Sequence, residues 1–355
     1  MSILSLVLRL AVRNFFHIFM SMIFVVVVLL LTPALVQAGT VNPLTVKAIL
    51  IHPRSIKEMY LYRDLIQTAA KNGFNTVVIE ATGWINYRAF PQVRLPNGFS
   101  EADIASLVDF ARSFNLDVVP YVVLLTHQQE VAKRFGPHLL LNKETLDVSI
   151  PETWEFERKL IDIHFELFHP KMMLIGHDEL WGYKDVASVK LALVAGTRRL
   201  TPDQFVSHAI KVHDYLATKN VKTIIWGDMF IVPDYGPRGA FGKLYSHTGS
   251  HGTNELVSQL ERLPKDIVVI DWHYENNATD YPSYDFLKKY GFKVWGASWH
   301  EKNNIDSFSK YVSARAGDGM MATTWNFCSE KHRDYLFKFV SESGKTFSKD
   351  TLDKP

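Results

Sequence analysis

Short apolar runs rich in β-branched residues recur along the chain, and an amphipathic segment follows most of them. The runs are continuously apolar rather than alternating, which is typical of strands that are buried on both faces. Repeated strand–helix units of this kind indicate a parallel sheet. Eight strands are predicted, at residues 46–51, 76–79, 117–123, 172–175, 223–226, 267–270, 293–296 and 320–324.

The predicted helices begin and end at residues that favour helix termini. Residues 201–204 read Thr-Pro-Asp-Gln, which is a capping box with proline at the first helical position. Ser100 is placed to cap a second helix, because the apolar residues that follow it share one helical face. Gly73 and Gly291 each stand where a left-handed residue ends a helix.

Eight strand–helix units without a glycine-rich dinucleotide-binding sequence favour a (β/α)8 TIM barrel, of the α/β class, over a doubly wound sheet. The 355 residues are enough for one such barrel, which typically takes about 250 residues. We expect a single barrel domain over residues 39–340 and a polar C-terminal tail over residues 341–355.

The N-terminus has the features of a targeting segment. Arg9 and Arg13 precede an apolar run that reaches Leu31, and residues 36–38 read Val-Gln-Ala, which fits a signal-peptidase site. We therefore expect residues 1–38 to be a signal peptide and the protein to be exported, either periplasmic or secreted. The alternative is an uncleaved membrane anchor, since the apolar stretch approaches spanning length. A membrane is an expected partner only in that case.

Composition excludes several classes of function. The net charge is +2 with no concentrated basic block, so nucleic acid is not an expected partner. Cys328 is the single cysteine, which rules out an internal disulfide and a metal site built from several thiolates. We expect neither a cofactor nor a bound metal.

Polar and aromatic residues follow nearly every predicted strand. Barrel enzymes build their active sites at this end of the strands, and aromatic side chains offer flat faces on which sugar rings stack. The candidate site residues are Arg54, Glu80, His127, Asp178, Glu179, Trp226, Asp228, Trp272, Tyr274, Trp299 and Trp325.

The adjacent carboxylates of Asp178 and Glu179 are the sharpest chemical feature. They directly follow a buried strand and a glycine, where ionised groups are costly unless they are paired or used. Glycosidases commonly place two carboxylates on either side of the bond that is cleaved, which adjacent residues cannot do in the same way. The pair fits one acid plus one residue that orients a nucleophile supplied by the substrate.

Residues 174–179, Leu-Ile-Gly-His-Asp-Glu, resemble the signature of glycoside hydrolase family 20, the β-N-acetylhexosaminidases. The resemblance covers about residues 45–330. It implies an exo-acting, retaining enzyme that cleaves terminal β-linked N-acetylglucosamine or N-acetylgalactosamine. Asp178 would orient the 2-acetamido group, and Glu179 would be the general acid/base. It further implies substrate-binding roles for Arg54, Glu80 and His127, with Trp226, Asp228, Trp272 and Trp325 around the sugar.

The chain departs from the family pattern in three ways. We expect the α+β domain that usually precedes the barrel to be lacking, because the first strand is predicted soon after residue 39. The usual Tyr-x-Asp after the seventh strand is replaced by a segment with Trp299, so Tyr274 is the candidate to contact the acetamido oxygen. Phe327 stands where an acidic residue usually follows Trp325 by two places, and Glu275 or Glu330 would replace it unless recognition of the outer hydroxyls differs.

Two other classes of protein are weighed against this interpretation. One is a carbohydrate-binding barrel that has lost its chemistry, against which the intact Asp178–Glu179 pair argues. The other is a metal-dependent barrel hydrolase. It is less favoured because no His-x-His follows the first strand. Its ligands would come from His52, His127, His177, Asp228, His273 and His300.

Overall fold

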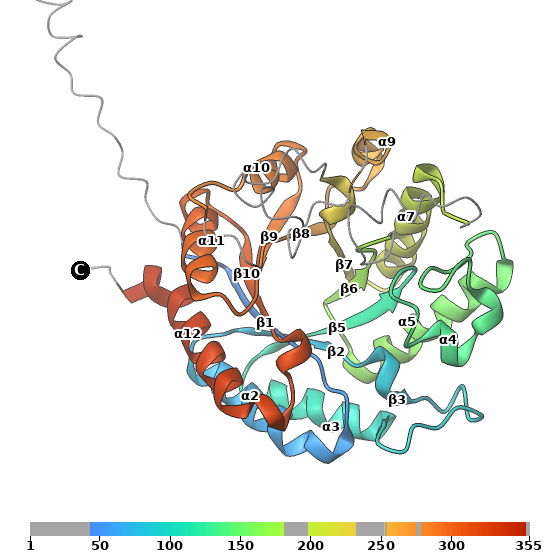
Figure 1. Ribbon diagram of the computed structural model, residues 1–355, viewed down its shortest axis with the longest axis horizontal. Coiled ribbons are helices and arrows are strands. Elements are labelled where there is room, and N and C mark those ends of the chain that lie inside the picture. The colour runs from blue at the N-terminus through green and yellow to red at the C-terminus, as the bar shows by residue number, and fades with distance from the viewer. Residues whose placement is uncertain (1–42, 181–197, 232–251, 253, 275–277, 353–355) are drawn as a thin grey trace, which may run out of the picture. The chain divides into compact units, whose positions relative to one another are not determined.

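The computed structural model describes residues 43–180, 198–231, 252, 254–274 and 278–352. The predicted signal peptide over residues 1–38 lies outside these residues. Eight parallel strands close into a barrel in the order β1-β10-β9-β8-β7-β6-β5-β2, and helices surround it (Figure 1). The predicted (β/α)8 TIM barrel is confirmed.

The barrel strands agree with the predicted runs to within two residues at either end. Their bounds are β1 Val46–Ile51, β2 Thr76–Glu80, β5 Asp117–Leu124, β6 Met172–Gly176, β7 Lys222–Trp226, β8 Val268–Trp272, β9 Lys293–Ser298 and β10 Gly319–Thr323. A two-stranded parallel sheet of β3 (Ile85–Asn86) and β4 (Phe99–Ser100) lies in the connection after β2. The barrel closes where β1 pairs with β10, with Val46 opposite Gly319.

The longer helices each pack an apolar face on the barrel or on a neighbouring helix. The α-helices are α2 Met59–Lys71, α3 Glu101–Arg112, α4 Ala132–Phe135, α5 Pro151–Phe168, α7 Pro202–Thr218, α9 Asn254–Val257, α10 Pro282–Lys289, α11 Lys302–Ala314 and α12 Arg333–Leu352. The 3-10 helices are η1 Ile56–Glu58, η2 Thr82–Trp84, η3 Pro137–Leu139, η4 Asp228–Phe230, η6 Leu260–Arg262, η7 Trp325–Phe327 and η8 Glu330–His332. Among the helices in the described part of the chain, none combines the length and hydropathy that a membrane span needs.

The helix termini are held as the sequence predicts. Thr201 and Gln204 form a reciprocal capping box at the start of α7, and Ser100 forms another with Asp103 at the start of α3. Gly73, after α2, has a φ of +87°, a left-handed conformation that glycine adopts without strain.

The segment from residue 341, predicted as a polar tail, is the continuation of α12 to Leu352. Phe347 is buried and meets the ring of Phe74 edge to face at 5.8 Å. The Cβ that any other residue would place at Gly344 lies within 3 Å of Asn72, so α12 packs closely on the end of α2. The segment is polar in composition, yet its few apolar residues fall on one face and anchor it.

Candidate functional site

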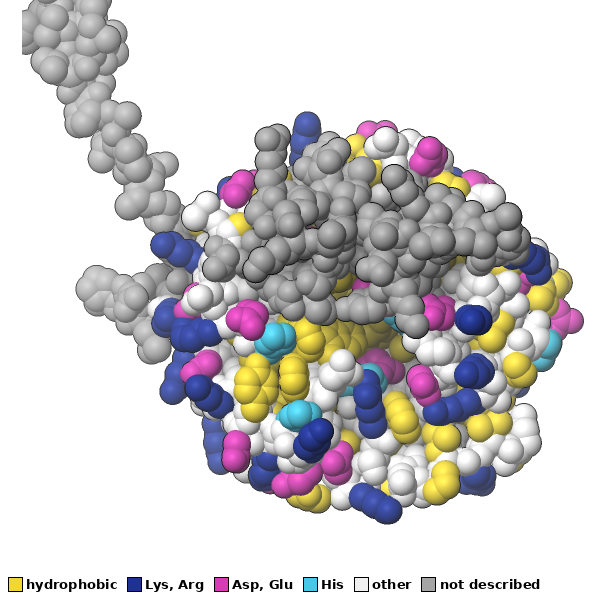
Figure 2. All heavy atoms as spheres, in the orientation of Figure 1, with side chains coloured by type: hydrophobic (Ala, Val, Ile, Leu, Met, Phe, Trp, Pro, Cys, Tyr) yellow, Lys and Arg dark blue, Asp and Glu magenta, His cyan; other side chains and the backbone are white. Residues whose placement is uncertain are grey.

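A cavity of about 530 Å³ opens at the carboxyl end of the barrel strands, a volume in the range of small-molecule sites. Its face of the molecule is hollowed, with hydrophobic side chains inside the hollow and acidic and histidine side chains near its edge (Figure 2). The lining residues include His52, Arg54, Glu80, Trp84, Tyr121, His127, Gln129, Glu130, Glu144, Asp178, Glu179, Trp226, Trp272, Tyr274, Trp299, Trp325 and Asn326.

Ten of the eleven predicted site residues line this cavity, and Asp228 is the exception. Asp228 begins η4 directly after β7, is fully buried, and accepts a hydrogen bond of 2.9 Å from the backbone N–H of Glu179. Asp228 therefore does not line the cavity with the other predicted substrate-binding residues. Its side chain supports the neighbouring loop from behind instead of facing a ligand.

The backbone that carries the two adjacent carboxylates is left-handed at three positions. Gly176 ends β6 with a φ of +79°, and His177 and Glu179 follow with φ values of +68° and +47°. Such a conformation costs a non-glycine residue roughly 1–2 kcal/mol and persists only where surrounding contacts impose it. The bond from Glu179 to Asp228 is one such contact. The strained turn brings the side chains of Asp178 and Glu179 to the same cavity.

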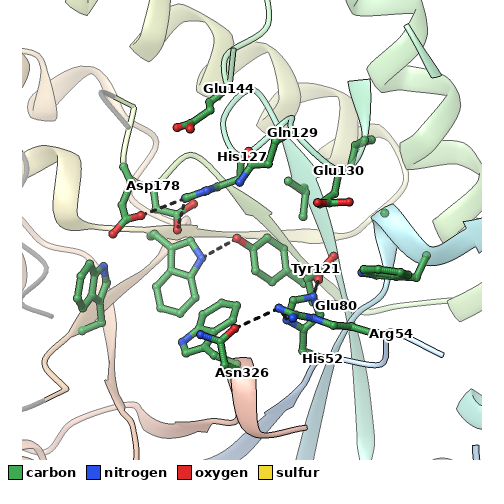
Figure 3. A pocket seen from close by; sticks show the side chains of 18 of the residues that line it. His52, Arg54, Glu80, Tyr121, His127, Gln129, Glu130, Glu144, Asp178 and Asn326 are labelled. Carbon is green, nitrogen blue, oxygen red and sulfur yellow. Dashed lines mark hydrogen bonds and ion pairs between the residues drawn. The ribbon is translucent and has the colours of Figure 1, made fainter. Parts of the chain in front are cut away.

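His127 meets both carboxylates at a single nitrogen. Its Nε2 atom lies 3.3 Å from Asp178 Oδ2 and 3.4 Å from Glu179 Oε2, and Figure 3 shows the imidazole directed at Asp178 across the cavity. The exposed fractions of the three side chains are 26% for His127, 13% for Asp178 and 9% for Glu179. Because two oxygens contact one nitrogen, the carboxylates lie on the same side of the cavity.

The charge of this cluster is set by the carboxylates. Burial lowers the pKa of His127. The charge and hydrogen bond of Asp178, and then the charges of Glu179 and Glu144, have a larger opposite effect and raise this pKa to about 10. His127 is therefore an imidazolium near neutral pH.

Aromatic side chains form the walls of the cavity. Trp272 and Tyr274 stack with ring centroids 4.7 Å apart. The indole N–H of Trp226 donates to the hydroxyl of Tyr121 at 3.1 Å, and that of Trp325 donates to the hydroxyl of Tyr274 at 2.9 Å. These bonds satisfy the polar edges of the rings. Trp226 and Trp272 are buried, whereas Trp325 is half-buried.

A second polar group lies at the end of β1 and β2. His52 Nε2 is 2.5 Å from Glu80 Oε2, and Glu80 also accepts the backbone N–H of Thr82. Burial raises the pKa of Glu80, but the charge and hydrogen bond of His52 outweigh it and hold this pKa below its ordinary value. Arg54, an exposed residue, approaches His52 Nδ1 at 3.3 Å and donates to Asn326 Oδ1 at 3.4 Å.

Asn326, directly after Trp325, is the side chain that accepts this bond from Arg54 (Figure 3). Phe327 packs against Trp299 outside the cavity. Glu330 pairs with Arg333 and does not line the cavity, so its expected role as the replacement acid is wrong. The other candidate, Glu275, lies outside the described residues.

The histidines and acids considered as metal ligands are dispersed. His52 pairs with Glu80, His127 with the adjacent carboxylates, and His273 with Asp271. In the described ranges, no group of three or more His, Cys, Asp or Glu side chains is arranged to hold a metal ion.

Several residues of the cavity were not found from the sequence. Tyr121 lies in the middle of β5 and Asn326 directly follows Trp325, and neither position differs in pattern from ordinary strand or loop residues. Glu144, Gln129 and Glu130 come from the long connection after β5, which carries no periodic signal. Only Asn326 had an indirect signal, because it neighbours a predicted sugar-contacting tryptophan.

In fold, the chain is a (β/α)8 barrel whose cavity opens at the carboxyl end of its strands, and solved structures of the same architecture include glycoside hydrolases of family 20. A β-N-acetylhexosaminidase from Bacteroides fragilis matches 85% of this chain at 15% identity, with a TM-score of 0.57. A family 20 exo-β-N-acetylglucosaminidase from Vibrio harveyi, solved with N-acetylglucosamine, matches 85% at 15% identity, with a TM-score of 0.59. Dispersin B matches 85% at 13% identity, with a TM-score of 0.56.

The extent of these matches differs from protein to protein. The chain spans 65% of the Bacteroides enzyme and 54% of the Vibrio enzyme, but 98% of dispersin B. No protein-family model and no curated protein sequence matches the chain. At these identities the likeness is one of fold, and the chemistry has to be argued from the site.

Proposed function

We propose that the protein is an exo-acting, retaining β-N-acetylhexosaminidase that hydrolyses terminal β-linked N-acetylhexosamine by substrate-assisted catalysis. The observation that carries the proposal is the meeting of Asp178 and Glu179 at one nitrogen of His127 inside an aromatic-walled cavity. The hexosaminidases that share the fold support the same class of reaction.

Asp178 is suited to receive an N–H group from the ligand. Its Oδ2 atom faces His127, while its Oδ1 atom is buried and has no hydrogen-bond partner among the described residues. A buried acceptor without a donor is costly, so a ligand that supplies a donor there gains affinity. The N–H of a 2-acetamido group is such a donor. Asp178 then stabilises the positive charge that develops as the acetamido oxygen attacks the anomeric carbon.

Glu179 is the proposed general acid and base. It protonates the glycosidic oxygen as the bond breaks and later deprotonates the water that opens the oxazolinium ring. Because Asp178 and Glu179 lie on one side of the cavity, they do not flank a scissile bond as an acid and an enzymic nucleophile do. A nucleophile within the substrate removes the need for a carboxylate on the opposite face. Two inversions at the anomeric carbon retain the β configuration.

The remaining cavity residues bind the sugar in this proposal. The faces of Trp226, Trp272 and Trp325 stack on the ring, and the guanidinium of Arg54 holds hydroxyl groups with the help of Asn326. The Tyr274 hydroxyl, which accepts the indole N–H of Trp325, is the proposed contact of the acetamido oxygen.

Turnover of chromogenic β-N-acetylglucosaminide and β-N-acetylgalactosaminide tests the proposed function. We expect hydrolysis by the wild-type protein and its loss in Asp178→Asn. Binding of N-acetylglucosamine without turnover would instead support a carbohydrate-binding barrel. Activity lost in a chelator and restored by a divalent metal would support the metal-dependent class.

We further propose that the protein is exported, on the basis of the N-terminal sequence alone. Cleavage after Ala38 leaves Gly39 as the mature N-terminus. N-terminal sequencing of protein recovered from the periplasm or medium of an expressing bacterium is expected to begin at Gly39. Recovery of the full-length chain in the membrane fraction would indicate an anchor instead.

A further inference from the structure

Three buried side chains form a hydrogen-bonded chain behind the loops that carry the site. Glu157 on α5 lies with Oε2 2.6 Å from His208 Nε2, and His208 on α7 lies with Nδ1 3.0 Å from His177 Nε2. His177 follows β6 and lies with Nδ1 3.1 Å from the carbonyl oxygen of Ile175. None of the three lines the cavity, and all are buried.

The Ile175 end of this hydrogen-bonded series fixes the direction of its hydrogen bonds. The carbonyl of Ile175 only accepts, so His177 donates through Nδ1–H and its Nε2 is left as an acceptor. His208 therefore donates from Nδ1 to His177. Burial, together with the charge of His208, lowers the pKa of His177 well below its ordinary value, in keeping with a neutral ring.

At its Glu157 end, this hydrogen-bonded series of side chains holds the loop that carries His127. Glu157 Oε1 accepts the backbone N–H of Leu125 at 3.0 Å. Leu125 and His127 are both left-handed, with φ values of +63° and +53°. The backbone after β6 is left-handed at His177 as well. Each strained loop is thus tied to one end of the same line of side chains.

The two loops meet at the reacting groups. One carries His127 and the other carries Asp178 and Glu179, and their contacts are 3.3 and 3.4 Å long. A shift of either loop changes those distances directly. The Glu157–His208–His177 chain is the polar connection that spans both loops from behind, through two different helices.

We propose that Glu157, His208 and His177 are positioning residues that set the distance between His127 and the Asp178–Glu179 pair. The proposal rests on the proposed function only for its kinetic consequence. The three residues touch no reacting group, and they act through the left-handed backbone of Leu125 and His177.

The alternative is a buried polar cluster that only stabilises the fold. Glu157→Met separates the two cases, because methionine keeps a similar volume but makes no hydrogen bond to Leu125 or His208. Glu157→Gln is the conservative rescue, since its amide oxygen still accepts from Leu125 while its N–H group donates to a neutral His208. If Glu157→Met does not fold, the double variant Glu157→Met/His208→Leu removes both members of the pair, so that His208 is not left buried without its acceptor, although the Leu125 N–H and His177 Nε2 still lose their partners.

His213→Leu is the matched control. His213 lies on the same helix as His208, is also buried, and bonds to Thr223 at 3.1 Å near the start of β7, at the opposite end of the barrel. Its loss removes a buried histidine hydrogen bond from α7 without touching either site loop. Both variants are expected to lower the midpoint of thermal unfolding.

The first measurement is the pKa of His127, followed by NMR through ring signals that disappear in His127→Gln. This pKa is about 10 because the carboxylates are close. We expect Glu157→Met to lower it by about one unit as the charges separate. Glu157→Gln and His213→Leu are expected to leave it unchanged. This measurement needs no enzymatic activity, so it tests the positioning role even if the proposed function is wrong.

The second measurement is the kinetics of hexosaminide hydrolysis. We expect Glu157→Met to reduce kcat by about 10²-fold, since displacement of reacting groups by about 1 Å has effects of that size, and to leave KM within about threefold. Glu157→Gln restores kcat, and His213→Leu does not reduce it. If Glu157→Met or the double variant folds with an unchanged His127 pKa, or if His213→Leu has the same effect, the positioning role is refuted.

Discussion

The ion pairs of His127 give the site a dependence on pH that stability measurements can detect. In the folded protein the pKa of His127 is about 10, raised from its ordinary value of 6.5 by Asp178, Glu179 and Glu144 in spite of burial. A raised pKa stabilises the folded state fully below pH 6.5, and that stabilisation is lost as the pH rises through 10. We predict that His127→Gln lacks this contribution.

The magnitude follows from the size of the shift. The difference between the two pKa values corresponds to about 5 kcal/mol as an upper bound. His127 retains 26% of its side-chain exposure and shares two neighbouring carboxylates, so solvent screening and coupling reduce this figure. We expect wild type to exceed His127→Gln by about 2–3 kcal/mol in unfolding free energy at pH 6.

Urea unfolding of both proteins at pH 6, 8 and 10.5 is the assay. Lysines and tyrosines also titrate near pH 10, but they are common to both proteins and cancel in the difference between them. The difference is expected to shrink steeply between pH 8 and pH 10.5. A difference that is the same at pH 6 and pH 10.5 would show that His127 is not held as an imidazolium by the carboxylates.

Three further changes have distinct expected outcomes. Glu179→Gln should abolish cleavage of natural glycans but spare activated aryl leaving groups, and equal loss on both, measured as kcat/KM, would exclude Glu179 as the proton donor. Arg54→Lys should lower kcat/KM about tenfold, because the exposed guanidinium makes only long hydrogen bonds to His52 and Asn326, and wild-type kinetics would exclude sugar binding by Arg54. Phe347→Ala should cost about 3 kcal/mol in unfolding free energy without changing kcat, and an unaffected stability would contradict the packing of α12.

Most of the fold follows from local patterns in the sequence. Strands buried on both faces are apolar without interruption, so β1 and β6 stand out from the segments around them. Caps such as Thr201 and left-handed glycines such as Gly73 mark helix ends for local reasons that need no tertiary contact. The continuation of α12 past residue 341 was missed because its anchors, Phe347 above all, depend on packing against α2 rather than on composition.

Site residues were predictable only where a chemically reactive side chain directly follows a buried strand. Carboxylates that directly follow a buried strand, such as Asp178, are unusual enough to be recognised from sequence. Asp228 satisfies the same rule yet turns away from the cavity to hold the backbone of Glu179, a distinction that depends on loop geometry. Glu157 and His208 had a signal that was overlooked, since each is a polar residue on the apolar face of its helix.

The most direct test of the proposed mechanism compares substrates that differ only at the 2-position. If the acetamido oxygen is the nucleophile, replacing its methyl hydrogens by fluorine weakens it, and kcat/KM on aryl β-glycosides should fall progressively from the acetamide to the trifluoroacetamide. The plain β-glucoside, which has no amide, should be essentially inert, since an intramolecular nucleophile contributes an effective molarity of about 10⁵ M or more. Rates that are independent of fluorination, together with good turnover of the glucoside, would contradict substrate assistance and favour a glycosidase that uses an enzymic carboxylate as nucleophile.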